Sequence, residues 1–576
     1  MKAKRWLSWL IAVGMTAAMF ACAFLFLDVM YAQNDDSAIV RSFMGSLTGE
    51  PASFHVFIHG LLALPLCWIS NAFPGIAWFT WLQLALVFLG CVVVAKSCMQ
   101  SFALAGRSFA AGVWVAAALL LAFGVRLCAR MTFTETAALL GAAAVGQVMS
   151  LDLSARPGRL VGGVLGAGAL VALGYALRQV TALPVLGFCA LAFGYRWLSM
   201  GVKGPHVKPL AVSLAVLAAA GGALAGWRYV EVQNSGEADY LAWQEASTQM
   251  VDYYGVLDVS DTALEAAGLT LREWELASDR FFLDDRMTTE AFATLRETME
   301  AEGAPPTNSG LDLIPSTFAS SPADARACAL GAWLLVLALL GAALGRRWLA
   351  GGAAMLCALA VACALAVLAL QGRLPMRAVY LAVLPAIVLL ACLLPRSLPQ
   401  TRGATALLAA ALLLVGAQSA YALGTFLPGV ILDEDQEAQM GSPMDVLEEY
   451  AAMYPDTLFL YDETIAAADL RLFPDAEWGL PTNVSFWGGW PMRTRETQEQ
   501  FARFGIDVDC FTPDLFLRDD VVLASGRLEP PPEELLAYLR DRLGTDVEVR
   551  LYSEYGPVYF FRFSKPSYET AGKRVD

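Results

Sequence analysis

The chain has 576 residues, of which 57% are hydrophobic and only 16% are charged, and its net charge at neutral pH is −15. A soluble globular chain carries about 25% charged residues, so this composition excludes a soluble enzyme and predicts a protein that lies mostly in lipid. The acidic balance argues against nucleic acid as a partner, because a phosphate backbone would be repelled.

The first element is an apolar run over residues 6–27, which follows three basic residues. It is long enough to cross a hydrocarbon core of about 30 Å. It exceeds the apolar region of a cleaved signal peptide and no A-x-A site follows it, so we expect a retained signal anchor. Ten further runs bring the prediction to about eleven transmembrane helices, and they cover residues 76–95, 109–125, 132–150, 160–177, 181–195, 210–227, 327–345, 348–370, 378–394 and 403–424.

The basic residues predict how these helices are oriented. If the short apolar stretch 54–70 does not cross, fourteen basic residues lie in the N-terminus and the loops of one side, and only six lie in the short loops of the other. Positive charge concentrates in cytoplasmic loops. We therefore expect a cytoplasmic N-terminus, and a juxtamembrane helix over 54–70 in the outer interface, against membrane lipid.

This topology divides the chain into four parts. Residues 1–227 contain seven transmembrane helices and the first outer loop, and residues 327–424 contain the last four helices. Between them lies a middle block, residues 228–326, with 19 acidic and 6 basic residues. This block and the tail, residues 425–576, are both extracytoplasmic. Periodicity in the middle block predicts helices over 240–254, 271–282 and 289–302.

The tail alternates between strand and helix patterns. TLFLYDET and VVLASG are typical of buried strands, whereas ETQEQFARFG and PEELLAYLRDRLG are typical of helices with turn residues after them. VEVRLYSEYGPVYFFRF predicts a terminal hairpin. The expected fold class is therefore a polytopic α-helical membrane protein with a C-terminal extracytoplasmic α/β domain.

Only six acidic residues lie outside the two hydrophilic blocks, and five of them fall in the first two outer loops, close to the six outer arginines. A carboxylate near hydrocarbon is expensive and indicates function. The acid pair Asp35 and Asp36, in YAQNDDSAIV, is the strongest candidate. One carboxylate would deprotonate an acceptor hydroxyl, while the other orients it or binds a cation. The alternative is that the NDDS turn only caps the following helix.

An acid pair in the first outer loop, directly after the first helix, resembles the GT-C superfamily of membrane glycosyltransferases. The stretch 54–70 occupies the position of that family's juxtamembrane helix. Glu135, in RMTFTETAALL, lies where many members have a second acid, and Arg178, in GYALRQVTALP, lies where many have a basic residue. The Pro-Pro element of many members is absent, and a glutamate replaces the commoner aspartate, which leaves metal use open.

The resemblance implies an inverting glycosyltransferase in a bacterial plasma membrane. It would move a sugar from a polyprenyl-phosphate donor to a glycan, lipid or protein acceptor, for synthesis or modification of a cell-surface glycan. Asp35 or Asp36 would be the base, and Glu135 would position the substrate or a divalent cation, Mg²⁺ or Mn²⁺, which is the one cofactor left open. Arg178 would bind the lipid phosphate together with Arg373 and Arg377 of QGRLPMR, in a late outer loop.

Other assignments remain open from the residues alone. A flippase or transporter of lipid-linked glycans would need polar groups along a path through the bundle, whereas the predicted spans are almost free of charge. A polysaccharide polymerase or ligase would use the outer arginines without needing the acid pair. A non-catalytic surface protein, with the tail as a binding module, is a further alternative.

Three further pairs of residues have two interpretations each. Arg126 and Arg130 bind phosphate or anchor at the interface. His55 and His59 have the i,i+4 spacing of metal ligands, and interfacial packing is the alternative. The tryptophans of WGGW stack on a sugar face or pack within the tail; they are Trp487 and Trp490.

Overall fold

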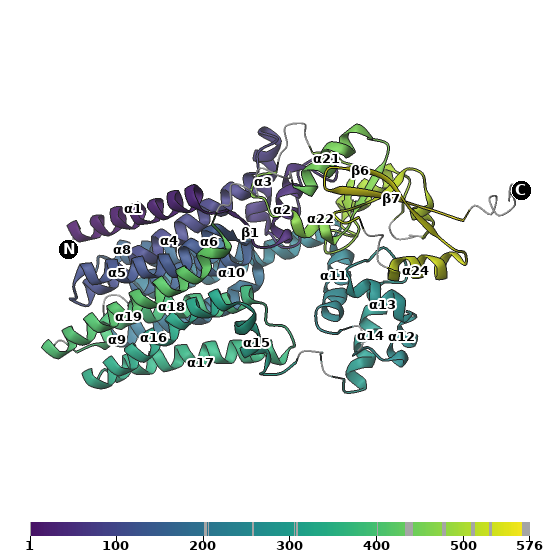
Figure 1. Ribbon diagram of the computed structural model, residues 1–576. Coiled ribbons are helices and arrows are strands. Elements are labelled where there is room, and N and C mark those ends of the chain that lie inside the picture. Colours follow the sequence, from purple (N-terminus) through teal and green to yellow (C-terminus); the bar gives the residue numbers. More distant parts are fainter. Residues whose placement is uncertain are drawn as a thin grey trace, which may run out of the picture.

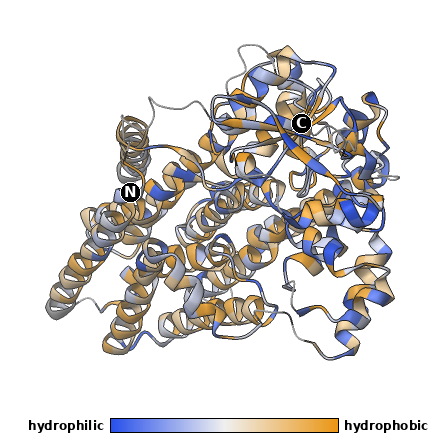
Figure 2. Cartoon of the chain, turned by 45° about the vertical axis from the view of Figure 1, so that its right-hand side comes forward, coloured by the Kyte–Doolittle hydropathy of each residue, from blue (hydrophilic) through white to orange (hydrophobic). Residues whose placement is uncertain are grey.

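The fold is described from a computed structural model that covers residues 2–200, 204, 207–255, 258–304, 306, 309–399, 401–431, 442–474, 480–507, 513–528 and 533–566. Long helices form a bundle, and both hydrophilic blocks gather at one end of it, which we call the block end (Figure 1). Hydrophobic residues dominate the bundle, and hydrophilic residues are concentrated in the two blocks (Figure 2). This distribution is expected if lipid surrounds the bundle and water surrounds the blocks.

Among the described residues, ten helices are long and apolar enough to cross a membrane. The polytopic helical architecture is therefore confirmed. One of the ten is a continuous run of α5 (Phe109–Leu119), the π-helical turn η1 (Leu120–Gly124) and α6 (Val125–Ala129). The others are α1 (Lys2–Phe26), α4 (Trp78–Leu104), α8 (Pro157–Leu177), α9 (Ala182–Met200), α10 (Val207–Ser235), α16 (Pro322–Gly345), α17 (Trp348–Leu370), α18 (Met376–Ser397) and α19 (Arg402–Phe426).

The eleventh predicted span is the short helix α7 (Phe133–Met149), which has 17 residues. It packs against α4, α8, α9 and α18 at the centre of the bundle. Its alanines and glycines allow these neighbours to approach closely, as in other membrane bundles. At Gly141, an added Cβ would lie 2.3 Å from a methyl carbon of Val185. Because its neighbours surround it, α7 is shielded from lipid whatever its length.

The stretch 54–70 is partly extended and partly helical. Helix α3 (Gly60–Ala72) begins after His59, whose side chain accepts a hydrogen bond from the backbone N–H of Leu61. The helix lies near the block end (Figure 1). Trp68 is 71% exposed and Phe73 is 57% exposed, which is typical of side chains that sit in a membrane interface. The exposed aromatic residues therefore agree with the expected juxtamembrane placement.

Arginine side chains join the turns at the end opposite the blocks. Arg107 donates to the carbonyl oxygens of Leu398 (2.6 Å) and Pro399 (2.9 Å). Arg396 donates to the carbonyl oxygen of Met149 at 3.0 Å. These turns follow α4, α7 and α18, so all three helices end on the same side of the bundle.

The first prediction concerns the side of the membrane on which each end of the bundle lies. A topology reporter fused after Arg107 should read as cytoplasmic, because the basic loops lie at that end. A reporter fused after Asp576 should read as extracytoplasmic. The measurement is reporter activity in intact cells, and a cytoplasmic reading for the tail would contradict the predicted orientation.

The tail contains the predicted strands and hairpin. β3 (Leu458–Tyr461), β4 (Val484–Phe486) and β5 (Val521–Ser525) are parallel neighbours, and the hairpin of β6 (Glu548–Tyr555) and β7 (Val558–Ser564) joins β5 antiparallel, in the order β4-β3-β5-β7-β6. The two predicted helices are present as α23 (Arg495–Arg503) and α24 (Glu533–Leu543). Two further helices were not predicted, and they are α21 (Pro443–Met453) and α22 (Glu463–Ala468).

The middle block is helical and contains the three predicted helices. α11 (Ala238–Val251), α13 (Leu271–Ser278) and α14 (Thr289–Ala301) correspond to them. α12 (Asp261–Ala267) and α15 (Leu313–Ser320) were not predicted, because each is too short to show a clear period.

One hydrophobic core joins the middle block to the tail. Trp274, Phe281 and Phe292 of the middle block belong to the same buried cluster as Phe516 and Tyr538 of the tail. The ring of Phe281 lies 5.9 Å from that of Tyr538, edge-on. The tail therefore completes its core on the middle block, and the two predicted parts form one packed unit.

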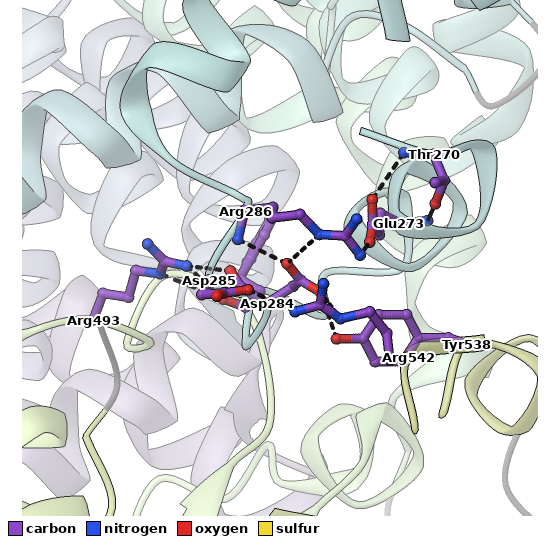
Figure 3. Close-up of polar contacts among 9 residues, drawn as sticks. Thr270, Glu273, Asp284, Asp285, Arg286, Arg493, Tyr538 and Arg542 are labelled. Carbon is purple, nitrogen blue, oxygen red and sulfur yellow. Dashed lines mark hydrogen bonds and ion pairs between the residues drawn. The ribbon is translucent and has the colours of Figure 1, made fainter. Parts of the chain in front are cut away.

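A buried carboxylate fixes the same interface (Figure 3). Asp284 of the middle block is fully buried, and it accepts a hydrogen bond of 2.5 Å from the hydroxyl of Tyr538. Arg542 of the tail lies 3.4 Å from Asp284 and donates to Asp285 at 2.7 Å. Such a buried pair is sensitive to geometry, so it sets the orientation of the middle block on the tail.

Candidate active site

Helix α2 (Asn34–Met44) carries the acid pair into the space between the bundle and the tail. The short parallel pairing of β1 (Met30–Tyr31) with β2 (Arg130–Met131) holds the segment before it. Gln33 is the N-cap and makes no side-chain cap bond, so Asp35 and Asp36 lie in the first turn. Their negative charges interact favourably with the positive end of the helix dipole. Neither side chain caps the helix, so capping does not explain the pair.

A cavity of about 520 Å³ opens at this point, where the helix ends, the middle block and the tail meet. Its volume is in the range of ligand sites, about 300–1,000 Å³. The bundle side contributes an acid and three arginines, the middle block contributes polar residues of α11 together with Asp252 and Arg280, and the tail contributes aromatic residues and two carboxylates. The residues used below are Asp35, Arg178, Arg373, Arg377, Gln244, Thr248, Asp252, Arg280, Tyr461, Glu463, Phe486 and Trp490.

The structure separates the two acids of the pair. Asp35 lines the cavity, and its Oδ2 lies 3.9 Å from the Nη1 of Arg377. Asp36 points away from the cavity and is fully buried. Its Oδ1 accepts hydrogen bonds from the amide of Gln83 and from the backbone N–H of Phe133, both at 2.8 Å. Asp35 therefore faces a ligand, while Asp36 attaches α2 to α4 and α7.

Burial changes the acidity of Asp36. It raises the pKa of this carboxyl to about 8, and the hydrogen bonds from Gln83 and Phe133 offset only part of that rise. Its Oδ2 has no hydrogen-bond partner among the described residues. A protonated Asp36 fits this environment, since the proton removes a buried charge that the two hydrogen bonds and the charge of Arg377 balance only in part.

Arg178 has the surroundings of an anion-binding residue. Its guanidinium lies 4.6 Å from the ring centre of Phe57 and 5.3 Å from that of Phe133. Within the described residues it has no carboxylate partner, and its Nε makes no hydrogen bond. Burial, with the nearby charges of Arg377 and Arg373, lowers its pKa to about 10. Arg178 stays charged at neutral pH, so an anion that enters the cavity would reduce the repulsion between its guanidinium and those of Arg377 and Arg373.

A shared carboxylate holds two more arginines on the cavity wall. Asp252, at the end of α11, is bound to Arg280 at 2.5 Å and also forms an ion pair with Arg373. Burial lowers the pKa of Arg373 to about 10, and the charge of Arg377 contributes. The sequence predicted Arg373 and Arg377 but missed Arg280, which was one of six basic residues in an acidic block.

The glycines of WGGW explain how Arg280 is placed. An added Cβ at Gly488 would lie 2.0 Å from the carbonyl oxygen of Arg280. That oxygen accepts a hydrogen bond of 2.9 Å from the backbone N–H of Gly489. Only glycine permits this close approach of the tail to the middle block. Trp487 is buried against Phe281 and does not line the cavity, whereas Trp490 does.

Three of the predicted residues are not among those that line the cavity. Glu135 is buried and bound to Arg126, with one Nη2–Oε1 distance of 3.1 Å. Arg126 also pairs with Asp324 at the start of α16. Arg130 lies 3.2 Å from Asp28. These charges neutralise one another between helices, so they stabilise the bundle and do not contact a ligand in the cavity.

The two histidines have packing roles. His59 caps α3, and its Nε2 lies 3.0 Å from the carbonyl oxygen of Leu224. His55 is buried with its ring 5.0 Å from that of Trp490, edge-on. Burial, together with the charge of Arg228, lowers the pKa of His55 to about 3. Among the described residues, no group of three or more His, Cys, Asp or Glu side chains is arranged to hold a metal ion.

Comparison with family models, with characterised proteins and with solved structures finds no match for this chain.

Proposed function

We propose that this protein is a GT-C-type membrane glycosyltransferase, which transfers a sugar from a polyprenyl-phosphate carrier to an acceptor hydroxyl at the outer face of a bacterial plasma membrane. The observation that carries the proposal is the placement of Asp35 beside Arg377 in a cavity that also contains Arg178 and Arg373. A carboxylate beside clustered arginines provides a general base and an anion site together.

The arginines would bind the donor phosphate. Arg178, Arg373 and Arg377 come from the ends of α8 and α18 and from the loop before α18, so they lie where the polar head of a lipid would emerge from the bundle. The phosphate is the leaving group. Guanidinium groups stabilise the negative charge that develops on its oxygen as the bond to the sugar C1 breaks.

Asp35 would activate the acceptor. Its carboxylate takes the proton of the acceptor hydroxyl as that oxygen bonds to C1 from the face opposite the phosphate, which inverts the configuration. Arg377, at 3.9 Å, links the base to the phosphate site. Asp36 supports this arrangement by holding α2 against the bundle.

Transport is less well supported, because in the described residues the two helices at the centre of the bundle are mostly apolar and closely packed. α18 has an apolar sequence that is 94% buried, and α7 is buried from Phe133 to Gly146. A flippase would need polar groups along a path through the bundle. In the described residues, the charged side chains that face a common cavity lie at the block end instead.

The second prediction tests the donor site. Arg178→Ala should raise the KM for the polyprenyl-phosphate donor at least tenfold, because it removes a charge-assisted contact worth about 1.5–3 kcal/mol. Arg178→Lys should recover part of the loss, since the charge returns without the planar fork. The measurement is transfer of a labelled sugar in membranes that contain the full chain.

Arg272→Ala is the matched control for that experiment. Arg272 is 46% exposed in its side chain, pairs with Asp541, and is not part of the cavity wall. Its loss should leave the donor KM unchanged. Equal donor KM values for wild type and Arg178→Ala would contradict the proposed phosphate site.

A further inference from the structure

One wall of the cavity lies beyond the helix ends and belongs to the two hydrophilic blocks. It consists of residues of α11 on one side and of the tail on the other. We call it the block wall and define it by Gln244, Thr248, Tyr461, Glu463, Phe486 and Trp490. Phosphate binding involves none of these six side chains, so the proposed donor site leaves the wall unexplained.

The block wall presents free hydrogen-bonding groups. Within the described part of the chain, the side chains of Gln244, Thr248 and Glu463 have no hydrogen-bond or ion-pair partner. They offer an amide, a hydroxyl and a carboxylate, which together can donate and accept. A set of unpaired polar groups around one space favours a ligand with several hydroxyl groups, because each would otherwise rely on water.

The same wall presents aromatic surface that is held in place. The ring of Trp490 has edge contacts with His55 at 5.0 Å and Phe57 at 5.2 Å. The hydroxyl of Tyr240 donates to the carbonyl oxygen of Trp490 at 2.5 Å. These contacts hold Trp490 at the cavity wall, where an aromatic side chain can pack against the apolar C–H groups of a ligand while nearby polar groups bind its hydroxyls.

We infer that the block wall is a carbohydrate subsite, so that the acceptor is a sugar hydroxyl of a glycan. The inference rests on the proposed function and extends it to the acceptor class. Sugars combine C–H faces with many hydroxyls, which is the chemistry that this wall offers. Asp35 lines the same cavity as the block wall and lies 3.9 Å from Arg377, so it can take the proton of a hydroxyl bound in the cavity.

Other acceptor classes fit less well. A lipid alcohol would place hydrocarbon in the wall farthest from the bundle, where the free groups are polar. A folded protein would need a flat open surface, whereas residues of the bundle, the middle block and the tail line this site as the walls of a cavity. A sugar at the end of a flexible glycan chain meets neither obstacle.

The test uses membranes with the full chain and polyprenyl phosphate that carries a radiolabelled sugar. After transfer, permethylation and linkage analysis identify the atom that received the label. We expect a new glycosidic bond to a sugar hydroxyl. Label that is released by β-elimination, or joined directly to a lipid alcohol, would overturn the inference and leave the glycosyltransferase proposal intact. Absence of any Asp35-dependent transfer would overturn both.

Variants then place the subsite. Trp490→Ala and Gln244→Ala should each raise the acceptor KM about tenfold or more without changing the donor KM. Trp490→Phe should keep most of the affinity, because it retains an aromatic face. Trp348→Ala is the control, since this tryptophan is 76% exposed at the far end of the bundle. If the donor KM changed instead, or if the two alanine variants had no effect, the block wall would not be the acceptor site.

Discussion

Asp35→Asn should lower the rate of sugar transfer by about 10²–10⁴-fold, the usual contribution of a general base. The side chain lines the cavity and keeps its shape when the carboxylate becomes an amide, so the variant loses the base without losing packing. Expression and melting temperature should stay close to wild type. The measurement is single-turnover transfer of a labelled sugar from polyprenyl phosphate.

Asp36→Asn is the matched control, because it makes the same change at the neighbouring residue. Asparagine resembles the protonated form of Asp36, and its carbonyl oxygen can accept the same bonds from Gln83 and Phe133. We expect transfer within a few-fold of wild type. If Asp36→Asn abolished transfer while Asp35→Asn retained it, the assignment of the base to Asp35 would be wrong.

Because Asp36 titrates, the stability of the wild-type protein relative to the Asp36→Asn variant should depend on pH. The folded pKa is raised to about 8 by burial, and the unfolded value is about 4. The folded state therefore holds the proton more tightly, and the stability due to Asp36 falls as pH rises from about 4 to about 8. The amide introduced by Asp36→Asn does not titrate, so melting temperatures of the variant should lack this part of the decline.

Arg41→Ala should destabilise the protein by about 3–5 kcal/mol, the usual effect of removing one partner from a buried ion pair. Arg41 of α2 binds Asp469 through two bonds, at 2.7 and 3.0 Å, and also pairs with Glu448. All three side chains are buried. The substitution leaves two buried carboxylates of the tail unbalanced, so we expect α2 and the tail to separate before the bundle unfolds.

Thermal unfolding of the full chain in detergent measures this effect. Arg518→Ala is the comparison, since Arg518 pairs with Asp520 at the surface and exposed pairs contribute about 0–1 kcal/mol. The defect of Arg41→Ala should shrink at low pH. Burial already raises the pKa of Glu448 to about 7 against the opposing charge of Arg41, and acid would neutralise this unbalanced carboxylate. A defect that grows toward low pH would contradict the ion-pair explanation.

The membrane part of the fold was predicted well because lipid imposes a simple rule. A span needs enough apolar length to bury its backbone polar groups, and length is visible in sequence. Apolar length alone does not predict the position of α7. Its 17 residues fall short of the other spans, yet its central place is fixed by packing with α4, α8 and α18, which a single sequence does not display.

The site was predicted only in part, and for a related reason. Asp35, Arg178, Arg373 and Arg377 stood out because charges are rare near apolar runs. Arg280, Asp252 and Glu463 did not, because they belong to blocks in which charges are common and they reach the cavity only through tertiary packing.

The sequence did not show that Glu135 belongs to a buried ion-pair network, because one member of that network is distant in the chain. Glu135 stands alone in an apolar run, as a catalytic acid of a membrane enzyme would. Only the structure reveals Arg126 and Asp324 beside it. Asp324 begins α16, so an acid at the start of a span was the available signal. Asp324 falls within the acidic middle block of the sequence, so its side chain was expected to be exposed to water.

Among the described residues, the cavity draws its walls from the helix ends of the bundle, the first outer loop, the middle block and the tail, and Trp490 and Pro491 are the last in the chain to contribute. Synthesis by the ribosome therefore delivers the arginines of the bundle well before the site can close. A nascent chain that has inserted its helices then has the proposed phosphate-binding residues but lacks the proposed acceptor wall. Under the proposed function, membrane insertion and the gain of activity would be separate events in time, and transfer would begin only when the tail docks on the middle block.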